Sequence, residues 1–289
     1  MRLPNETLAY LGPAGTFSHQ AAQQWVQRDF AGAQDYPSVM ETIMAVVNNK
    51  AAAAVVPVEN SIEGSVAVTM DLLLQEPLHI LGETILDINH CLAAKSKDRP
   101  LEIIVSHPQA LAQCRGYLQK HYPNTKIQQA DSTGRAAQMA ADNPPGLGAI
   151  CSKYAADLNR LEIISENLAD SLNNQTRFLL IGHRKATTGR KATGQDKTSL
   201  IVGLPHDKPG GLYEILWEFA QLNINLSRIE SRPNKKDLGH YLFYIDCQGH
   251  QLETRLAEAI NSLESKASFL QILGSYPVGR NGGKDAAST

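Results

Sequence analysis

Four short segments of this 289-residue chain place polar side chains, glycine or proline where a predicted strand ends or begins. They are residues Gly12–Ser18, Val56–Ser61, Ser106–Ala110 and Asn174–Phe178. In an open α/β sheet, ligands bind beyond the carboxyl ends of the strands, and free N–H groups at the start of the next helix favour an anion. Each segment alone is also compatible with an ordinary turn, but together they predict a binding site.

The second and third segments bring different polar groups within a few residues of one another. Asn60 and Ser61 follow Glu59 directly, so a strand ends in a carboxylate, an amide and a hydroxyl, although either of the last two could instead cap a helix. His107 could act as a base or a donor, and Gln109 could donate to a carboxylate from the first turn of a helix. A lone histidine is more often structural.

The fourth segment carries the chemistry that we weigh most heavily. Along a strand, alternation would put Thr176 and Phe178 on one face and Arg177 on the other. The hydroxyl of Thr176 can both donate and accept, and the guanidinium of Arg177 suits a carboxylate. Taken alone, the segment favours the ordinary start of a strand, with a surface arginine and a core phenylalanine.

The elements that must position these residues follow from the apolar pattern. Short strands alternate with helix-length segments over about 180 residues, which is typical of an α/β fold with helices on both faces of a sheet. Strands are expected at 8–11, 52–58, 102–105, 149–151 and 178–182, an extended segment at 80–94, and helices from about 16 and from 106 to about 121.

A second unit follows a change of composition. Residues 183–197 are rich in Lys, Arg, Thr and Gly without an apolar period, which predicts a linker; a basic recognition patch is the less favoured alternative. The order βαββαβ then predicts a ferredoxin-like sandwich. Its strands are expected at 199–204, 226–232, 240–247 and 269–276, its helices at 209–222 and 252–263, and a disordered tail at 277–289.

Composition excludes several classes of protein. A net charge of −2 with 19% charged residues argues against nucleic acid as a partner and against a disordered chain. The apolar run Ala51–Val58 is too short to cross a membrane, and the N-terminus lacks a signal-peptide pattern, so we expect a cytoplasmic protein with no membrane partner. The four cysteines form no C-x-x-C pair and the histidines no H-E-x-x-H, so we expect reduced thiols and no metal.

In this order, and followed by a βαββαβ unit, the four segments resemble bacterial prephenate dehydratases over about residues 7–276. The resemblance implies an α/β, two-lobed catalytic domain of the type II periplasmic-binding-protein kind at residues 1–182. Its lobes would be about 7–93 plus 177–182, and 94–176. An ACT regulatory domain would follow at 198–276. The implied reaction converts prephenate into phenylpyruvate, water and carbon dioxide in phenylalanine biosynthesis, without a cofactor.

The resemblance also implies roles for individual residues. Thr176 is expected to hydrogen-bond to or protonate the departing hydroxyl, and because threonine is a weak acid it would relay or position the proton. Ser132 and Thr133 precede another predicted helix and could add an anion-binding N-terminus. The expected substrate-binding residues are Asn60, Ser61, His107, Gln109, Ala110, Thr133, Arg177 and Phe178.

Two segments of the second unit resemble ACT domains of dehydratases. Residues 229–233 carry an intact Glu-Ser-Arg-Pro run, whereas Gly211 and Tyr213 depart from the usual Ala and Val. The resemblance implies an L-phenylalanine site between two ACT domains, and therefore a homodimer at least and a homotetramer by analogy. The expected effector-binding residues are Pro209, Gly210, Gly211, Leu212, Tyr213, Asn225, Leu226, Glu230, Ser231 and Arg232.

Three other functions remain open at this point. Arogenate dehydratase acts on a substrate that carries an amine in place of the side-chain ketone of prephenate, and the sequence does not separate the two. A non-catalytic amino-acid-binding module would share the two-lobed fold. A transcription regulator is less favoured, because no basic helix-turn-helix segment stands out.

Overall fold

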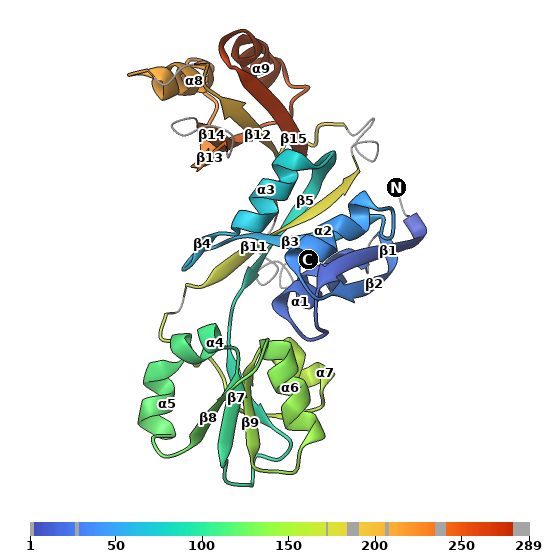
Figure 1. Ribbon diagram of the computed structural model, residues 1–289, viewed down its shortest axis with the longest axis vertical. Coiled ribbons are helices and arrows are strands. Elements are labelled where there is room, and N and C mark those ends of the chain that lie inside the picture. Colours follow the sequence, from blue (N-terminus) through green and yellow to red (C-terminus); the bar gives the residue numbers. More distant parts are fainter. Residues whose placement is uncertain are drawn as a thin grey trace. The chain divides into compact units, whose positions relative to one another are not determined.

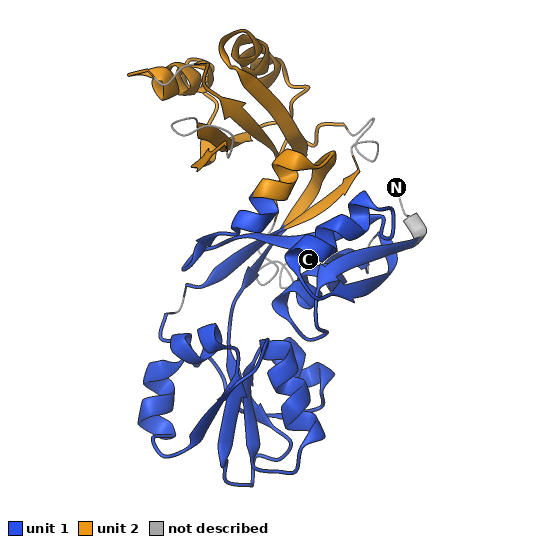
Figure 2. Cartoon of the chain, viewed as in Figure 1, with its two compact units in different colours: residues 1–70, 84–178, 280–289 blue, residues 71–83, 179–279 orange. Residues whose placement is uncertain are grey.

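The computed structural model describes residues 3–26, 29–171, 173–183, 191–205, 208–234 and 241–279. Among these, the chain forms two compact units (Figure 2). Unit 1 holds the residues up to Met70 together with Thr84–Phe178. Unit 2 holds Asp71–Glu83 and Leu179–Gly279. The candidate substrate-binding segments lie in unit 1 and the βαββαβ segment lies in unit 2.

The first sheet has the strand order β2-β1-β3-β11-β5, with β4 beside β3 (Figure 1). Residues Ala53–Val56 of β3 are all buried, as expected for a strand that is covered on both faces. The boundary between the two units runs through α3, β5 and β11. The elements are β1 (Leu3–Leu11), α1 (Phe17–Val26), β2 (Phe30–Tyr36), α2 (Val39–Val47), β3 (Ala53–Asn60), β4 (Gly64–Ser65), α3 (Ala67–Gln75), β5 (Leu78–Asp87) and β11 (Gln175–His183).

The second sheet has the order β10-β6-β9-β7-β8. Helices α4 and α5 cover one of its faces and α6 and α7 the other (Figure 1). Side-chain oxygens cap two of the helices, since Ser132 accepts from Arg135 N and Ser152 accepts from Ala155 N. The elements are β6 (Cys91–Ala94), β7 (Ile103–Ser106), α4 (Pro108–Gln113), α5 (Arg115–His121), β8 (Lys126–Gln129), α6 (Thr133–Asp142), β9 (Leu147–Cys151), α7 (Lys153–Leu158) and β10 (Glu162–Ser165).

These two sheets form the two lobes of the predicted catalytic domain, with boundaries that differ slightly from the expected ones. The extended segment at 80–94 divides into β5 and β6, which belong to different sheets, so the second lobe starts at Cys91. The return strand β11 begins at Gln175, three residues earlier than the strand expected at 178–182. The helix expected from 106 to 121 is interrupted at Cys114, between α4 and α5.

Within unit 1, the two lobes meet beside the loop between β1 and α1. A Cβ at Gly134 in α6 would lie 2.7 Å from Ala14 O and 3.0 Å from the carbonyl carbon of Gly15. Nearby, His19 Nδ1 accepts from Gly15 N at 3.1 Å and lies 3.2 Å from the hydroxyl of Tyr154 in α7. Burial lowers the pKa of His19, which favours the neutral, accepting ring. Backbone therefore packs on backbone where the lobes touch.

Unit 2 contains the predicted βαββαβ domain. Its sheet has the order β13-β14-β12-β15, with antiparallel pairs throughout. Apolar side chains of the sheet and of both helices form one core, including Leu200, Ile215, Phe219 and Leu263. The elements are β12 (Asp196–Gly203), α8 (Gly211–Ala220), β13 (Leu226–Pro233), β14 (Tyr241–Gln248), α9 (Thr254–Lys266) and β15 (Phe269–Pro277).

Residues 71–83 pack within unit 2 against this sheet. Lys197 Nζ lies 3.0 Å from Oε1 of Glu83, whose side chain is buried. Arg232 Nη2 lies 2.9 Å from Asp71 Oδ1. A Cβ at Gly274 would collide with a backbone carbonyl in β5, so the strands approach each other closely. Ion pairs and a backbone contact therefore hold the βαββαβ domain against residues 71–83, which precede it by more than a hundred residues.

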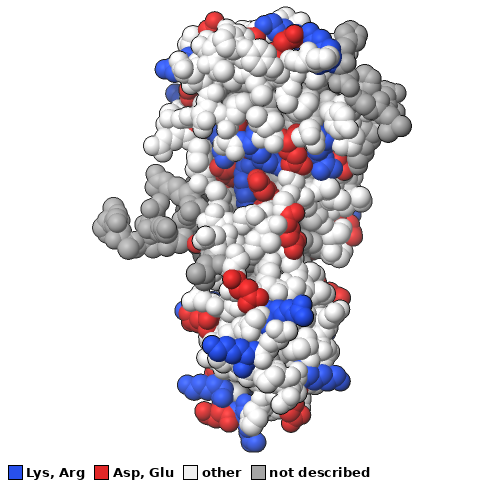
Figure 3. Space-filling model, turned by 90° about the vertical axis from the view of Figure 1, so that its left-hand side faces the viewer, with Lys and Arg blue, Asp and Glu red and all other residues white. Residues whose placement is uncertain are grey.

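The predicted linker and tail are partly outside the described residues. Residues 191–195 form neither helix nor strand, β12 begins at Asp196, and 184–190 lie outside the described part. The predicted tail starts too early, because Pro277 belongs to β15 and Val278 N donates to Gln195 O at 3.0 Å; residues 280–289 lie outside the described part. No helix within the described ranges is long and apolar enough to span a membrane. On the face shown in Figure 3, acidic and basic side chains are interspersed.

The contact at Gly134 can be tested with Gly134→Ala. Because the new methyl group would meet backbone atoms, which cannot rotate away, we expect the free energy of unfolding to fall by about 1–3 kcal/mol in a urea titration. The matched control is Gly32→Ala, where a Cβ meets nothing within 4 Å and the change should stay within about 0.5 kcal/mol. Equal effects of the two substitutions would contradict the close contact.

Candidate active site

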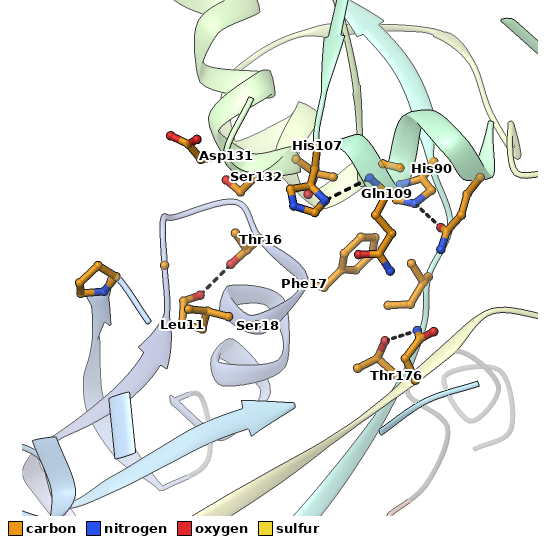
Figure 4. Close-up of a pocket in the computed structure, with 17 residues that line it drawn as sticks. Leu11, Thr16, Phe17, Ser18, His90, His107, Gln109, Asp131, Ser132 and Thr176 are labelled. Atoms are coloured by element: carbon orange, nitrogen blue, oxygen red, sulfur yellow. Dashed lines mark hydrogen bonds between the residues drawn. The ribbon is translucent and has the colours of Figure 1, made fainter. Parts of the chain in front are cut away.

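A cavity of about 300 Å³ lies between the two lobes of unit 1 (Figure 4). It is within the size range of small-molecule sites. Figure 4 shows Phe17, His107, Gln109 and Thr176 arranged around a common space. The lining residues are Leu11, Gly12, Thr16, Phe17, Ser18, Pro37, Asn60, Ile88, His90, His107, Gln109, Ala110, Gln113, Asp131, Ser132, Thr133 and Thr176.

Two ten-residue helices begin at this cavity. Helix α1 starts at Phe17, after Thr16, whose hydroxyl accepts from His19 N at 3.2 Å. Helix α6 starts at Thr133, after its cap Ser132. The free N–H groups of such first turns attract anions. Among the described residues that line the cavity none is Lys or Arg, so an anion bound here would be held by N–H groups and neutral polar side chains.

Thr176 belongs to a chain of side-chain amides whose direction is fixed at one end. Asn60 Oδ1 accepts from the backbone N–H groups of Ile62 at 3.0 Å and Glu63 at 3.1 Å, so its Nδ2 must be the donating end. That nitrogen lies 2.9 Å from Thr176 Oγ1 and 2.7 Å from Asn174 Oδ1. Because Thr176 accepts from Asn60, its own proton is available to the cavity.

The chain of amides continues into the second lobe. Asn174 accepts from Asn60, so its Nδ2 donates to Gln113 Oε1 at 3.2 Å. His90 Nε2 lies 3.2 Å from the same oxygen. The ring of His90 is buried and meets the ring of Phe17 edge to face, with 5.7 Å between centroids. Burial lowers the pKa of His90, partly offset by the hydrogen bond with Gln113.

The structure brings most of the predicted substrate-binding residues to this cavity. Asn60, His107, Gln109, Ala110, Thr133 and Thr176 all line it. His107 caps α4, and its Nδ1 accepts from Gln109 N at 3.4 Å.

Three predicted residues lie outside the lining. Ser61 Oγ donates to Asn173 O at 3.0 Å and accepts from Gln175 N at 2.9 Å. Arg177 Nη1 lies 4.0 Å from Glu59 Oε2, and Phe178 is buried. The expected alternation along β11 is present, since Thr176 and Phe178 are buried and Arg177 is half-buried.

Six residues that line the cavity were not predicted from the sequence: Leu11, Pro37, Ile88, His90, Gln113 and Asp131. Gln113 follows Gln109 by four residues, so helical spacing could have placed both on one face. His90 lies in the short connection between β5 and β6, inside a segment that was expected to be continuously extended. The apolar pattern of this segment gives no sign that the chain passes here from the first sheet to the second.

The predicted effector residues lie at two places in unit 2. Gly210, with φ of 84°, precedes α8, and Tyr213 is 66% exposed with its ring 6.2 Å from that of Trp217. On β13, Glu230 pairs with Arg228 and lies 3.5 Å from Arg232 Nη1. The remaining predicted residues belong to the same two segments: Pro209, Gly211 and Leu212 at the start of α8, and Asn225, Leu226 and Ser231 at or in β13.

Comparison with known proteins gives consistent matches over both domains. The family model for prephenate dehydratase matches residues 8–186, and the model for the ACT domain matches residues 198–265. The prephenate dehydratase of Methanocaldococcus jannaschii is 44% identical over 279 residues, which cover 95% of this chain and 99% of that protein.

Solved structures also match over most of the chain. A prephenate dehydratase from Arthrobacter aurescens in complex with L-Phe is 36% identical with a TM-score of 0.81, covering 94% of this chain and 90% of that chain. GqqA, described as a novel type of quorum quenching acylase, is 29% identical with a TM-score of 0.83, covering 94% and 98%.

These matches agree with the architecture built from the sequence. The chain has a catalytic domain of two α/β lobes, followed by a C-terminal ACT domain. Identity of 44% over nearly the full length of both proteins, together with the domain match, leaves no ambiguity of family. The chain belongs to the prephenate dehydratase family.

Proposed function

We propose that the chain is a lyase that converts prephenate into phenylpyruvate, water and carbon dioxide in the cytoplasm. One observation carries the proposal: in a cavity lined by helix N-termini, the hydroxyl of Thr176 accepts from Asn60 and keeps its proton for a ligand. A hydroxyl so oriented can donate to an oxygen that leaves with a negative charge.

The reaction needs no external oxidant or reductant. The bond between the ring and its carboxylate breaks, and the electron pair enters the ring to complete the aromatic system. The ring C–O bond breaks at the same time, and the departing oxygen takes a proton to become water. The enzyme must hold two carboxylates, stabilise the leaving oxygen and enclose the ring.

The lining of the cavity suits this chemistry. A cation paired tightly with the ring carboxylate would stabilise it in the ground state and oppose its loss as carbon dioxide. Described lining residues include no Lys or Arg, and the starts of α1 and α6 can hold carboxylates with a weaker, distributed charge. Phe17, Ile88 and Ala110 supply apolar surface for the ring.

The other predicted residues take supporting roles in this proposal. His107, Gln109 and Thr133 hydrogen-bond the substrate from the second lobe. Ser61 and Arg177 act from outside the cavity, since Ser61 bonds to the start of β11 and Arg177 faces Glu59. Phe178 supports the buried face of β11.

Replacement of the Thr176 hydroxyl tests the proposal. We expect Thr176→Ala to lower kcat for phenylpyruvate formation by about 100- to 1000-fold, the usual loss for one donor to a developing charge. Thr176→Ser should retain part of the activity, because the hydroxyl survives. The assay follows phenylpyruvate by its absorbance, with Thr125→Ala, in the turn before β8, as control. Near-normal turnover by a folded Thr176→Ala variant would contradict the assignment.

One observation favours the arogenate alternative. Among the described residues that line the cavity, Asp131 is the one Asp, Glu, Lys or Arg. Its carboxylate could pair with the amine of arogenate. The named relatives act on prephenate according to their names, which favours prephenate. A comparison of kcat/KM for prephenate and for arogenate distinguishes the two activities.

The ACT domain makes the enzyme responsive to L-phenylalanine in this proposal. The relative from Arthrobacter aurescens was solved with L-Phe, and backbone N–H groups at Gly210–Gly211 can receive an amino-acid carboxylate. The site would form between two ACT domains, which makes the enzyme a homodimer at least and a homotetramer by analogy. Effector binding would act on the cleft through lobe closure or subunit packing.

Regulation can be tested at Gly210. We expect L-phenylalanine to lower turnover of prephenate, and Gly210→Ala to weaken that response without altering turnover in its absence. A Cβ at Gly210 meets nothing within 4 Å, so the substitution acts through the positive φ alone. Gly194→Ala is the matched control, with φ of 81° and equally open surroundings. An enzyme that neither binds nor responds to L-phenylalanine would contradict the proposal.

A further inference from the structure

We infer that His90 is a positioning residue, which holds Gln113 so that the amide nitrogen of Gln113 faces the substrate. The inference rests on the proposed function, because it assigns the cavity to the substrate. It extends the site by a residue of the connection between β5 and β6, and it follows from the direction of the hydrogen bonds.

The direction of these hydrogen bonds is fixed by two backbone N–H groups, which can only donate. The N–H groups of Ile62 and Glu63 only donate, so Asn60 presents oxygen to them and nitrogen to Asn174. Asn174 then presents nitrogen to Gln113, whose oxygen must accept. Each step leaves one orientation of the next amide.

His90 is the last member of this chain. Its Nε2 lies 3.2 Å from Gln113 Oε1, an oxygen that already accepts from Asn174, so Nε2 must carry a proton and donate. A neutral ring with its proton on Nε2 leaves Nδ1 bare. Nδ1 of His90 is buried and has no hydrogen-bond partner among the described residues, which suits a bare nitrogen better than an unpaired N–H.

The two donors together determine what Gln113 offers to the cavity. With Oε1 held by Asn174 and His90, the Nε2 end of Gln113 is the one left for a ligand, and Gln113 lines the cavity. Without His90, the side-chain amide of Gln113 would have one hydrogen bond fewer to hold its orientation. The rotated amide would turn an oxygen towards an anionic substrate, which it would repel. His90 thus acts through Gln113.

Two substitutions separate hydrogen bonding from packing. In His90→Gln the side-chain nitrogen is as many bonds from Cα as Nε2 of histidine, so a donor can reach Gln113. In His90→Phe the ring remains beside Phe17, but the donor is lost. The control is His121→Phe, on the exposed end of α5 in the same lobe.

We expect kcat/KM of His90→Phe for prephenate to fall about 10- to 100-fold, with KM raised, because a substrate that is repelled by the rotated amide is both held less tightly and misplaced. His90→Gln should recover most of that loss, and His121→Phe should behave as wild type. Normal kcat/KM in a folded His90→Phe variant would overturn the inference. So would a His90→Gln variant as impaired as His90→Phe, because the restored donor would then have recovered no activity.

A second measurement does not depend on activity. Nitrogen-15 NMR of the histidine-labelled wild-type protein reports which ring nitrogen carries the proton, and the resonances missing in His90→Gln identify His90. We expect a neutral ring protonated on Nε2. A proton on Nδ1 would overturn the inference whatever the activity of the variants. Wild-type protein that fails to turn over prephenate would instead sink the proposed function and leave the tautomer result standing.

Discussion

The site depends on two backbone N–H groups that point at one oxygen. Ile62 and Glu63, in the turn after β3, fix Asn60 with its nitrogen towards Thr176 and Asn174. An amide that could rotate would let Thr176 donate to Asn60 and withhold its proton from the substrate. A backbone N–H group can only donate. The conformation of the turn after β3 therefore determines whether the hydroxyl of Thr176, more than a hundred residues further along the chain, accepts from Asn60 or donates to it.

The fold brings these residues together at the two places where the chain passes between the sheets. His90 lies on the passage from β5 to β6, Asn174 lies on the passage from β10 to β11, and Thr176 follows at the start of β11. Asn60 ends β3, and Gln113 ends α4. Both lobes therefore contribute to one hydrogen-bonded chain, and the backbone contact at Gly134 holds them close beside it. A cleft between lobes can exclude water and still open for the product.

Much of this could be predicted from the sequence, and the failures have physical causes. The βαββαβ unit was predicted because its strands carry clear apolar runs that bury one face. Strand β2 was missed because it is an edge strand with mostly half-exposed residues, so no apolar run marks it. Thr176 was predicted from a motif and a strand end. The partnership of His90 with Gln113 was not, since a hydrogen bond between distant segments leaves no trace in local pattern.

The most direct test of this account is the turnover number of Asn60→Asp on prephenate. Aspartate keeps the size of the side chain and can still accept from Ile62 and Glu63, but its second oxygen faces Thr176 and would draw the hydroxyl proton away from the cavity. The account predicts a fall in kcat of about 100-fold or more in a folded protein, with Asn124→Asp in an exposed turn as control. A kcat within about threefold of wild type would contradict it.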